Sequence, residues 1–278
     1  MAQTDGMPTE AGFDALMPSD MAAKAEQVGV NKAALPLHRL VPLGILAGVF
    51  IGFGALFATV VTADTTLSPG IAKLLGGVVF SVGLILVVVS GAELFTGNTL
   101  IVMAFASRRV SAKRVLRNWV VVYLANFVGA VALAAMVAWS GRLDAAGGAV
   151  GTRALAIAES KGAVHFGEAV MSGVLANILV CLAVWMTMSA HTLVDKVVVI
   201  VPPIAAFVAA GFEHSVANMY FFPVALFHGT TPAQTHVTWS TFLAHNLLPV
   251  TIGNLLGGAA MVGLVYWFIY LRDRPPVG

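Results

Sequence analysis

Four long uncharged stretches dominate the sequence. Asp, Glu, Lys and Arg are absent from residues 40–63, 118–141, 169–194 and 214–271. An α-helix needs about 20 residues to cross the hydrocarbon core of a bilayer, so each stretch is long enough to span a membrane. Transmembrane β-strands would instead appear as short segments of alternating polarity. The pattern therefore predicts an all-α polytopic membrane protein.

The apolar segments and the interruptions within them predict six spans. We expect them at about residues 37–62, 69–106, 115–139, 166–189, 197–228 and 242–271. The second is interrupted at Gly91–Glu93. The fifth reaches Gly211–His214 after about 24 Å of helix, although the core is about 30 Å thick. Spans 2 and 5 are therefore predicted to break inside the membrane.

The two ends of the chain are polar. Residues 1–35 are expected to form a tail that contains an amphipathic helix, because residues 13–34 carry apolar side chains at spacings of three and four. These are Phe13, Leu16, Met17, Met21, Ala25 and Val28. The helix either docks and orders the terminus or acts as a regulatory plug. The transmembrane domain is expected at 36–272, and 273–278 as a second tail.

Basic residues indicate the orientation in the bilayer. Five of them crowd the connection between spans 2 and 3: Arg108, Arg109, Lys113, Arg114 and Arg117. Lys and Arg are enriched in cytoplasmic loops, so six spans place both termini in the cytoplasm as well. With 59% hydrophobic and 10% charged residues the chain is not a soluble domain, which carries about 25% charged residues. A net charge of +2 does not suggest nucleic-acid binding.

The two predicted breaks belong to a repeated pattern. Gly91, Glu93 and Asn98 recur as Gly211, Glu213 and Asn218, offset by 120 residues. Asn118, Asn126 and Gly129 recur as Asn246, Asn254 and Gly257, offset by 128 residues. The pattern predicts two copies of a three-span unit, 36–140 and 165–272. An odd number of spans in each copy inverts the second copy in the membrane.

Polar groups at the breaks are the candidate functional residues. Glu93 and Glu213 are the acidic residues expected within the core, where charge is expensive and usually functional. Alternatively, each accepts hydrogen bonds from backbone amides freed by the break and holds the loop. His214 stands where the first copy has Leu94 and can titrate near neutral pH, so we predict a functional role for it. Asn126, Asn177 and Asn254 either line the pathway or bridge helices.

Four motifs resemble those of the formate/nitrite transporter family. They are GAELFTGN (91–98), CLAVWM (181–186), GFEHSVANMY (211–220) and PVTIGN (249–254). The resemblance covers nearly the whole chain. It implies a homopentamer of aquaporin-like protomers in the lipid bilayer of the bacterial inner membrane, each passing formate or similar small anions without a cofactor. Gly97 follows LFT where the formate channels have Ser, so nitrite and hydrosulfide stay open as substrates.

The resemblance also implies roles for single residues near the centre of the pore. Leu94 and Thr96 match positions beside the pore at the first break. His214 matches the central histidine of the family, supported by Thr96 and Asn218. A histidine there would link formate transport to protons by donating a hydrogen bond or a proton.

Three further residues match the entrance and its barriers. Phe80 and Phe207 match the two apolar constrictions of the family, and Lys161 matches a lysine near the outer vestibule. A dry constriction does not solvate an anion, whose idealised transfer cost is of order 20 kcal/mol. A weak acid avoids that cost by crossing as its neutral form, while Lys161 raises the local anion concentration.

Two other classes of protein fit the sequence less well. An intramembrane enzyme needs a positioned nucleophile and base or a metal site. The chain has no HExxH motif, and Glu213 and His214 are adjacent, so they would not share a helix face. Phenylalanine constrictions and the charged Lys161 are poorly suited to a pore for neutral solutes such as water or glycerol. We therefore expect a channel, without enzymatic activity or a metal.

Overall fold

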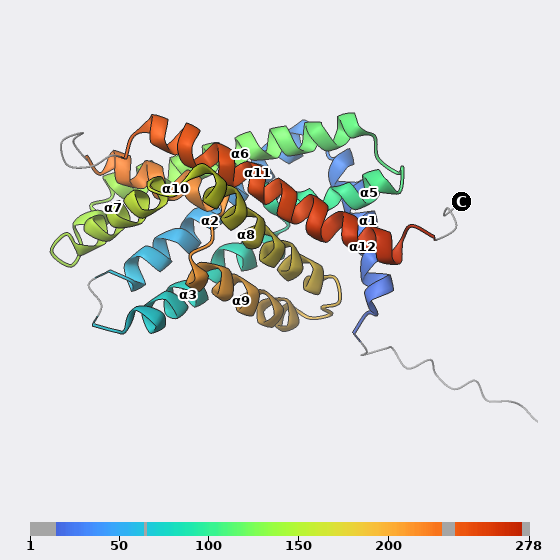
Figure 1. The fold of residues 1–278 in the computed structure, drawn as a ribbon, viewed down its shortest axis with the longest axis horizontal. Helices are drawn as coiled ribbons and strands as arrows, with labels where there is room; N and C mark the ends of the chain where they lie inside the picture. The colour runs from blue at the N-terminus through green and yellow to red at the C-terminus, as the bar shows by residue number, and fades with distance from the viewer. Residues whose placement is uncertain (1–14, 64–65, 230–236, 274–278) are drawn as a thin grey trace, which may run out of the picture.

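The computed structural model describes residues 15–63, 66–229 and 237–273, and these form a helical bundle (Figure 1). Within this part of the chain, six helices are long and apolar enough to cross a membrane. They are α2 (Leu37–Val61), α3 (Pro69–Ser90), α6 (Ala112–Trp139), α8 (Phe166–Thr187), α9 (Leu193–Ala210) and the continuous helix Thr241–Tyr270. The prediction of an all-α protein with six spans is confirmed.

Both predicted breaks are present, and both begin at a glycine. α3 ends at Gly91, with φ of 71°, and α9 ends at Gly211, with φ of 77°. This left-handed conformation is readily adopted by glycine. The chain continues after the first break as α4 (Phe95–Asn98), η1 (Thr99–Ile101) and α5 (Val102–Ala106). After the second break it continues as α10 (Ser215–Phe227).

The last span departs from regular α-helix. It comprises η3 (Thr241–Leu247), α11 (Leu248–Leu255), η4 (Leu256–Leu264) and α12 (Val265–Tyr270). η3 and η4 are π-helical, which places each hydrogen bond one residue further along than in an α-helix.

Close helix contacts are made through glycine in both repeats. Gly129 of α6 lies against the carbonyl of Ile45 in α2, and a Cβ there would clash with it. Gly257 lies in the same way against the carbonyl of Val174 in α8. These paired contacts relate α2 and α6 to α8 and the last span, as expected for an inverted repeat.

Each repeat is preceded by one further helix, and only the first of the two was predicted. α1 (Pro18–Ala34) buries Met21 and Ala25 against Trp185 and Leu271, so it is docked on the bundle. α7 (Ala149–Gly162) occupies a stretch for which the sequence predicted no helix. The two lie at opposite ends of the molecule (Figure 1). Residues 1–14, including Phe13, and most of the predicted carboxy-terminal tail lie outside the described residues.

Candidate functional site

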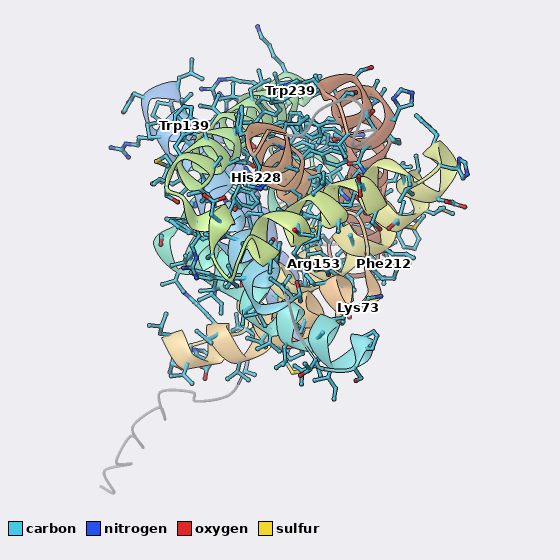
Figure 2. The ribbon with its side chains drawn as sticks, turned by 90° about the vertical axis from the view of Figure 1, so that its left-hand side faces the viewer. Lys73, Trp139, Arg153, Phe212, His228 and Trp239 are labelled. Carbon is cyan, nitrogen blue, oxygen red and sulfur yellow. The ribbon has the colours of Figure 1, made fainter. Side chains whose placement is uncertain are left out.

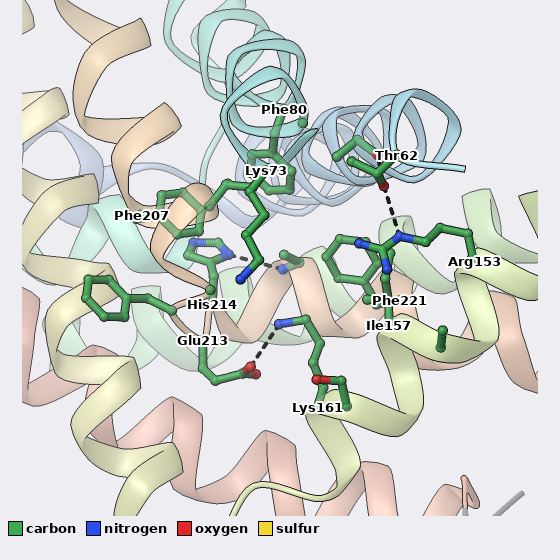
Figure 3. Close-up of a pocket in the computed structure, with 18 residues that line it drawn as sticks. Thr62, Lys73, Phe80, Arg153, Ile157, Lys161, Phe207, Glu213, His214 and Phe221 are labelled. Atoms are coloured by element: carbon green, nitrogen blue, oxygen red, sulfur yellow. Dashed lines mark hydrogen bonds and ion pairs between the residues drawn. The ribbon is translucent and has the colours of Figure 1, made fainter. Parts of the chain in front are cut away.

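A cavity of about 290 Å³ opens beside α7 and reaches the second break. Charged groups occur along its lining, and phenylalanine rings and His214 lie around it (Figure 3). The charged lining residues are Lys73, Arg153, Lys161 and Glu213. We call this cavity the vestibule. It brings together predicted site residues from α3, α7, α9 and the second break.

Phe80 and Phe207 line one position in the vestibule. Their ring centroids are 5.5 Å apart, and the rings meet edge to face at 89°. The expectation of two separate phenylalanine-lined constrictions is therefore wrong. The physical reason is the close approach of α3 and α9, where Gly77 lies directly against the backbone of Ala205. A larger residue than glycine at 77 would hold the two rings apart.

His214 joins the two broken spans. Its ring is buried, with 2% exposed, and lies 5.9 Å from the ring of Phe207. Nδ1 accepts a hydrogen bond from the backbone amide of Ala217 at 3.1 Å, which caps α10. Nε2 lies 2.9 Å from Oγ1 of Thr96. An imidazole that accepts at Nδ1 carries its proton on Nε2, so Nε2–H donates to Thr96.

Glu213 is the centre of a polar cluster at the second break. Its carboxylate pairs with Nζ of Lys161 at 2.9 Å. Asn218 donates to Oε2 of Glu213 at 2.7 Å and to Oδ1 of Asn246 at 2.7 Å. Asn246 in turn donates to the carbonyl of Lys161 at 3.0 Å. The four residues thus tie α7, the break, α10 and the last span together.

The first break contains the same cluster. Nζ of Lys32 lies 2.7 Å from Oε1 of Glu93. Asn98 donates to Oε2 of Glu93 at 2.6 Å and to Oδ1 of Asn118 at 2.9 Å. Asn118 donates to the carbonyl of Lys32 at 3.1 Å. Lys32 of α1 is therefore the counterpart of Lys161 in α7, which the sequence analysis did not identify.

In each break an asparagine accepts from one freed backbone amide. The glutamates accept from lysine and asparagine side chains, and not from backbone amides as one interpretation of the sequence proposed. Oδ1 of Asn126 accepts from the amide of Phe95 at 2.9 Å, and Oδ1 of Asn254 accepts from the amide of Ser215 at 2.9 Å. Their amide nitrogens donate to backbone carbonyls on both sides, including that of Gly44 at 2.7 Å and of Gly173 at 2.8 Å. Both asparagines thus bridge helices.

Asn177 of α8 also bridges helices, whereas Leu94 has an apolar side chain. Nδ2 of Asn177 donates to the carbonyl of Asn254 at 2.6 Å, while its buried Oδ1 has no partner among the described residues. Leu94 is 2% exposed and precedes α4 where His214 precedes α10. It supplies no side-chain cap. The two breaks are therefore equivalent in backbone and unequal in chemistry.

Two cations of the vestibule were not predicted as site residues from the sequence. Lys73 lies on α3, and Arg153 lies on α7, where its Nε donates to Oγ1 of Thr62 at 3.0 Å. Figure 2, seen from the α7 end, has Lys73, Arg153 and Phe212 on the same face of the molecule. The apolar pattern of α3 did not indicate that Lys73 would line a cavity. Arg153 belonged to a helix that was not predicted.

These features define an integral membrane protein of the channel class, in which two broken spans meet around a histidine. The family model described as formate/nitrite transporter matches residues 19–268. The chain belongs to the formate/nitrite transporter family.

Relatives agree with this assignment along almost their whole length. The chain is 44% identical to "Formate channel FocA" of Escherichia coli (strain K12), covering 96% of this chain and 99% of that one. It is 40% identical to "Probable formate transporter" of Methanothermobacter thermautotrophicus, covering 92% and 97%.

Solved structures give the same result. "Pentameric formate channel with formate bound" superposes with a TM-score of 0.79 at 43% identity, covering 85% of this chain and 98% of that one. "FNT family ion channel" superposes with a TM-score of 0.80 at 29% identity, covering 90% and 99%. The predicted membership of the family is confirmed.

Proposed function

We propose that this anion channel conducts formate through each protomer, by way of the vestibule, the Phe80–Phe207 pair and His214. One observation carries the proposal. A single cavity is lined by a lysine, an apolar ring pair, and a histidine linked to the other broken span. A relative at 44% identity is described as a formate channel, which supports formate as the substrate.

Two dry barriers in series favour weak acids: the ring pair, and Leu94 at the first break. Two phenylalanine edges offer no hydrogen bonds to an anion, so the ionised form crosses them at high cost. Formate that takes up a proton in the vestibule crosses as formic acid instead. Lys161 contributes by raising the anion concentration at the entrance. The proton and the formate then cross together, which is the proposed proton linkage.

His214 acts in this mechanism by donating a hydrogen bond. Its Nδ1 is occupied by the amide of Ala217, so the available proton is the one on Nε2. Transferring that proton to formate would leave an imidazolate, which is a far stronger base than formate. Nε2–H therefore gives up its hydrogen bond to Thr96 and donates to an oxygen of the substrate instead. The transported proton enters with the substrate.

The assembly and its location follow from the same relatives and from the charges. We place the protein in the inner membrane as a homopentamer, because a solved neighbour at 43% identity is described as pentameric. Both termini are placed in the cytoplasm, on the side of the basic connection between α5 and α6. Lys161 and the vestibule then face the opposite side.

Stopped-flow measurement of proteoliposomes tests the substrate. Uptake of formate, nitrite, hydrosulfide and glycerol is compared at equal gradients. We expect formate to permeate fastest, and faster at pH 5 than at pH 7. Nitrite is the second candidate, because Gly97 stands in the first break where the formate channels have Ser. Glycerol permeation equal to that of formate would contradict the proposal.

A further inference from the structure

The vestibule contains positive charges in addition to that of Lys161, which pairs with Glu213. Three cations and one carboxylate line it, and Glu213 pairs with Lys161. Within the described residues, neither Lys73 nor Arg153 forms a salt bridge with a carboxylate. Two positive charges are therefore uncompensated in a cavity of about 290 Å³.

Both side chains are placed to meet a ligand. Lys73 extends from α3 into the cavity, and Arg153 enters it from α7, on the same side of the helix as Lys161 (Figure 3). The hydrogen bond from Nε of Arg153 to Thr62 fixes the guanidinium. Its two terminal nitrogens have no protein partner in the described part of the chain. A fixed guanidinium with free donors matches the geometry of a carboxylate.

Arg153 is also partly withdrawn from water. It is half-buried, and burial lowers the pKa of its guanidinium from the usual value, although the group stays charged. A partly desolvated cation gains from an incoming anion more than a fully hydrated one does.

The position equivalent to Arg153 in the other repeat is occupied by a lysine. The offset of 129 residues that relates Lys161 to Lys32 relates Arg153 to Lys24 of α1. Nζ of Lys24 donates to the carbonyl of Met188 at the end of α8, as Arg153 donates to Thr62 at the end of α2. The contact with a helix end is thus common to both repeats, but at this pair of equivalent positions the α1 end has an ammonium and the α7 end has a guanidinium whose terminal nitrogens are free within the described residues.

We propose that Lys73 and Arg153 form an anion-recruitment site for small carboxylates, which binds the substrate in the vestibule before it reaches Lys161 and the ring pair. The inference rests on the proposed conduction of formate. Neutralising a recruitment site lowers flux mainly at low substrate concentration. A passive channel has the same permeability in both directions, so a site on one side of the membrane does not change the direction of flow. Its location is instead detected by adding a competing ligand to one side at a time.

The first test measures the first-order rate of formate flux in proteoliposomes at low formate concentration. Lys73→Gln and Arg153→Gln are each expected to lower the rate about threefold at low ionic strength, and the double variant about tenfold. The loss should shrink at 0.5 M salt, where charges are screened over only a few ångströms. Arg142→Gln, on an exposed arginine outside the cavity lining, is the matched control and should change nothing.

The second test measures where the site faces. Succinate is added to one side of vesicles of known orientation at pH 7, where it is a dianion and would need two protons to become neutral. We expect it to inhibit formate flux from the α7 side only, and the double variant to raise the inhibitory concentration at least tenfold. Thr62→Val removes the hydrogen bond but keeps the charge, and Arg153→Lys keeps the charge on a different side chain. Both should weaken the inhibition, because the fixed guanidinium is lost, but less than Arg153→Gln does, because the positive charge remains.

Two results would overturn the inference. One is a double variant with an unchanged low-concentration rate and unchanged inhibition by succinate. The other is a loss of flux that is equally large at high salt, which would indicate a packing role. Failure of the proposed function is recognised separately, because wild-type protein would then conduct no formate at all.

Discussion

Oγ1 of Thr96 and Nε2 of His214 lie 2.9 Å apart, although 118 residues separate them in the chain. The contact connects α4, after the first break, to the start of α10, after the second. Both groups are buried, so the hydrogen bond is shielded from water. In the proposed pathway, this Nε2–H donor already has a partner and can exchange it for a substrate oxygen.

Replacing Thr96 tests this exchange. Thr96→Val keeps the shape but leaves the buried Nε2–H of His214 without an acceptor, which costs about 1–3 kcal/mol of the free energy of unfolding. We expect a lower midpoint of thermal unfolding in detergent and a changed formate flux. Thr96→Ser retains the hydroxyl and should stay close to wild type. Equal behaviour of the two variants would show that the hydroxyl is not used.

Two substitutions of His214 separate folding from transport. His214→Phe removes both the cap of α10 and the donor to Thr96, so we expect acid-stimulated formate uptake to be lost. His214→Asn keeps a side chain that caps helices well and can still donate a hydrogen bond. Its effect should be milder, with the oligomer intact by size-exclusion chromatography. Unchanged uptake by His214→Phe at both pH 5 and pH 7 would rule out the central role of the histidine.

Lys161 has a structural role in addition to the recruitment expected from the sequence. Glu213 is buried, and Lys161→Ala would leave its charge unpaired, at a cost of about 3–5 kcal/mol in stability. We expect thermal unfolding to shift downward and the flux at low formate to fall, with only part of the flux loss relieved by salt. Adding Glu213→Gln should recover most of the stability.

Lys73→Gln in the same cavity is the control for that experiment, because Lys73 has no carboxylate partner in the described residues and its loss should not affect unfolding. A Lys161→Ala variant of normal stability, whose flux recovers fully at high salt, would mean that Lys161 acts on anion concentration alone.

The repeat was predictable because its polar residues recur at fixed spacing. Glu and Asn are rare inside membrane spans, so the recurrence of Glu93 and Asn98 as Glu213 and Asn218 was visible without a structure. The lysines that complete the two clusters were not found as a pair. Lys32 could not be recognised from local spacing, since its partner lies 61 residues away.

Other features depend on packing that no local pattern encodes. α7 is short and carries charges, and its buried residues are small, such as Ala154 and Ala158, so it lacks the long apolar run that marks the spans. The contact of Phe80 with Phe207 depends on how closely α3 and α9 approach. Sequence spacing within one helix gives no information on that distance. The π-helical turns of the last span were likewise not predicted from the sequence.

The last prediction concerns Leu94, which occupies the position of His214 in the other repeat. Its side chain is 2% exposed and apolar, so the first break should act as a dry gate and the second as the polar site. Leu94→Ala would widen that gate without removing a hydrogen-bond donor. We expect faster permeation of formate and, at the same time, a measurable chloride conductance in planar bilayers, because chloride has no neutral form and is excluded by dry constrictions. Leu94→Met, of similar volume, should keep chloride out. If formate flux rises in Leu94→Ala while chloride stays excluded, the barrier to ions is the Phe80–Phe207 pair and the first break is not the gate.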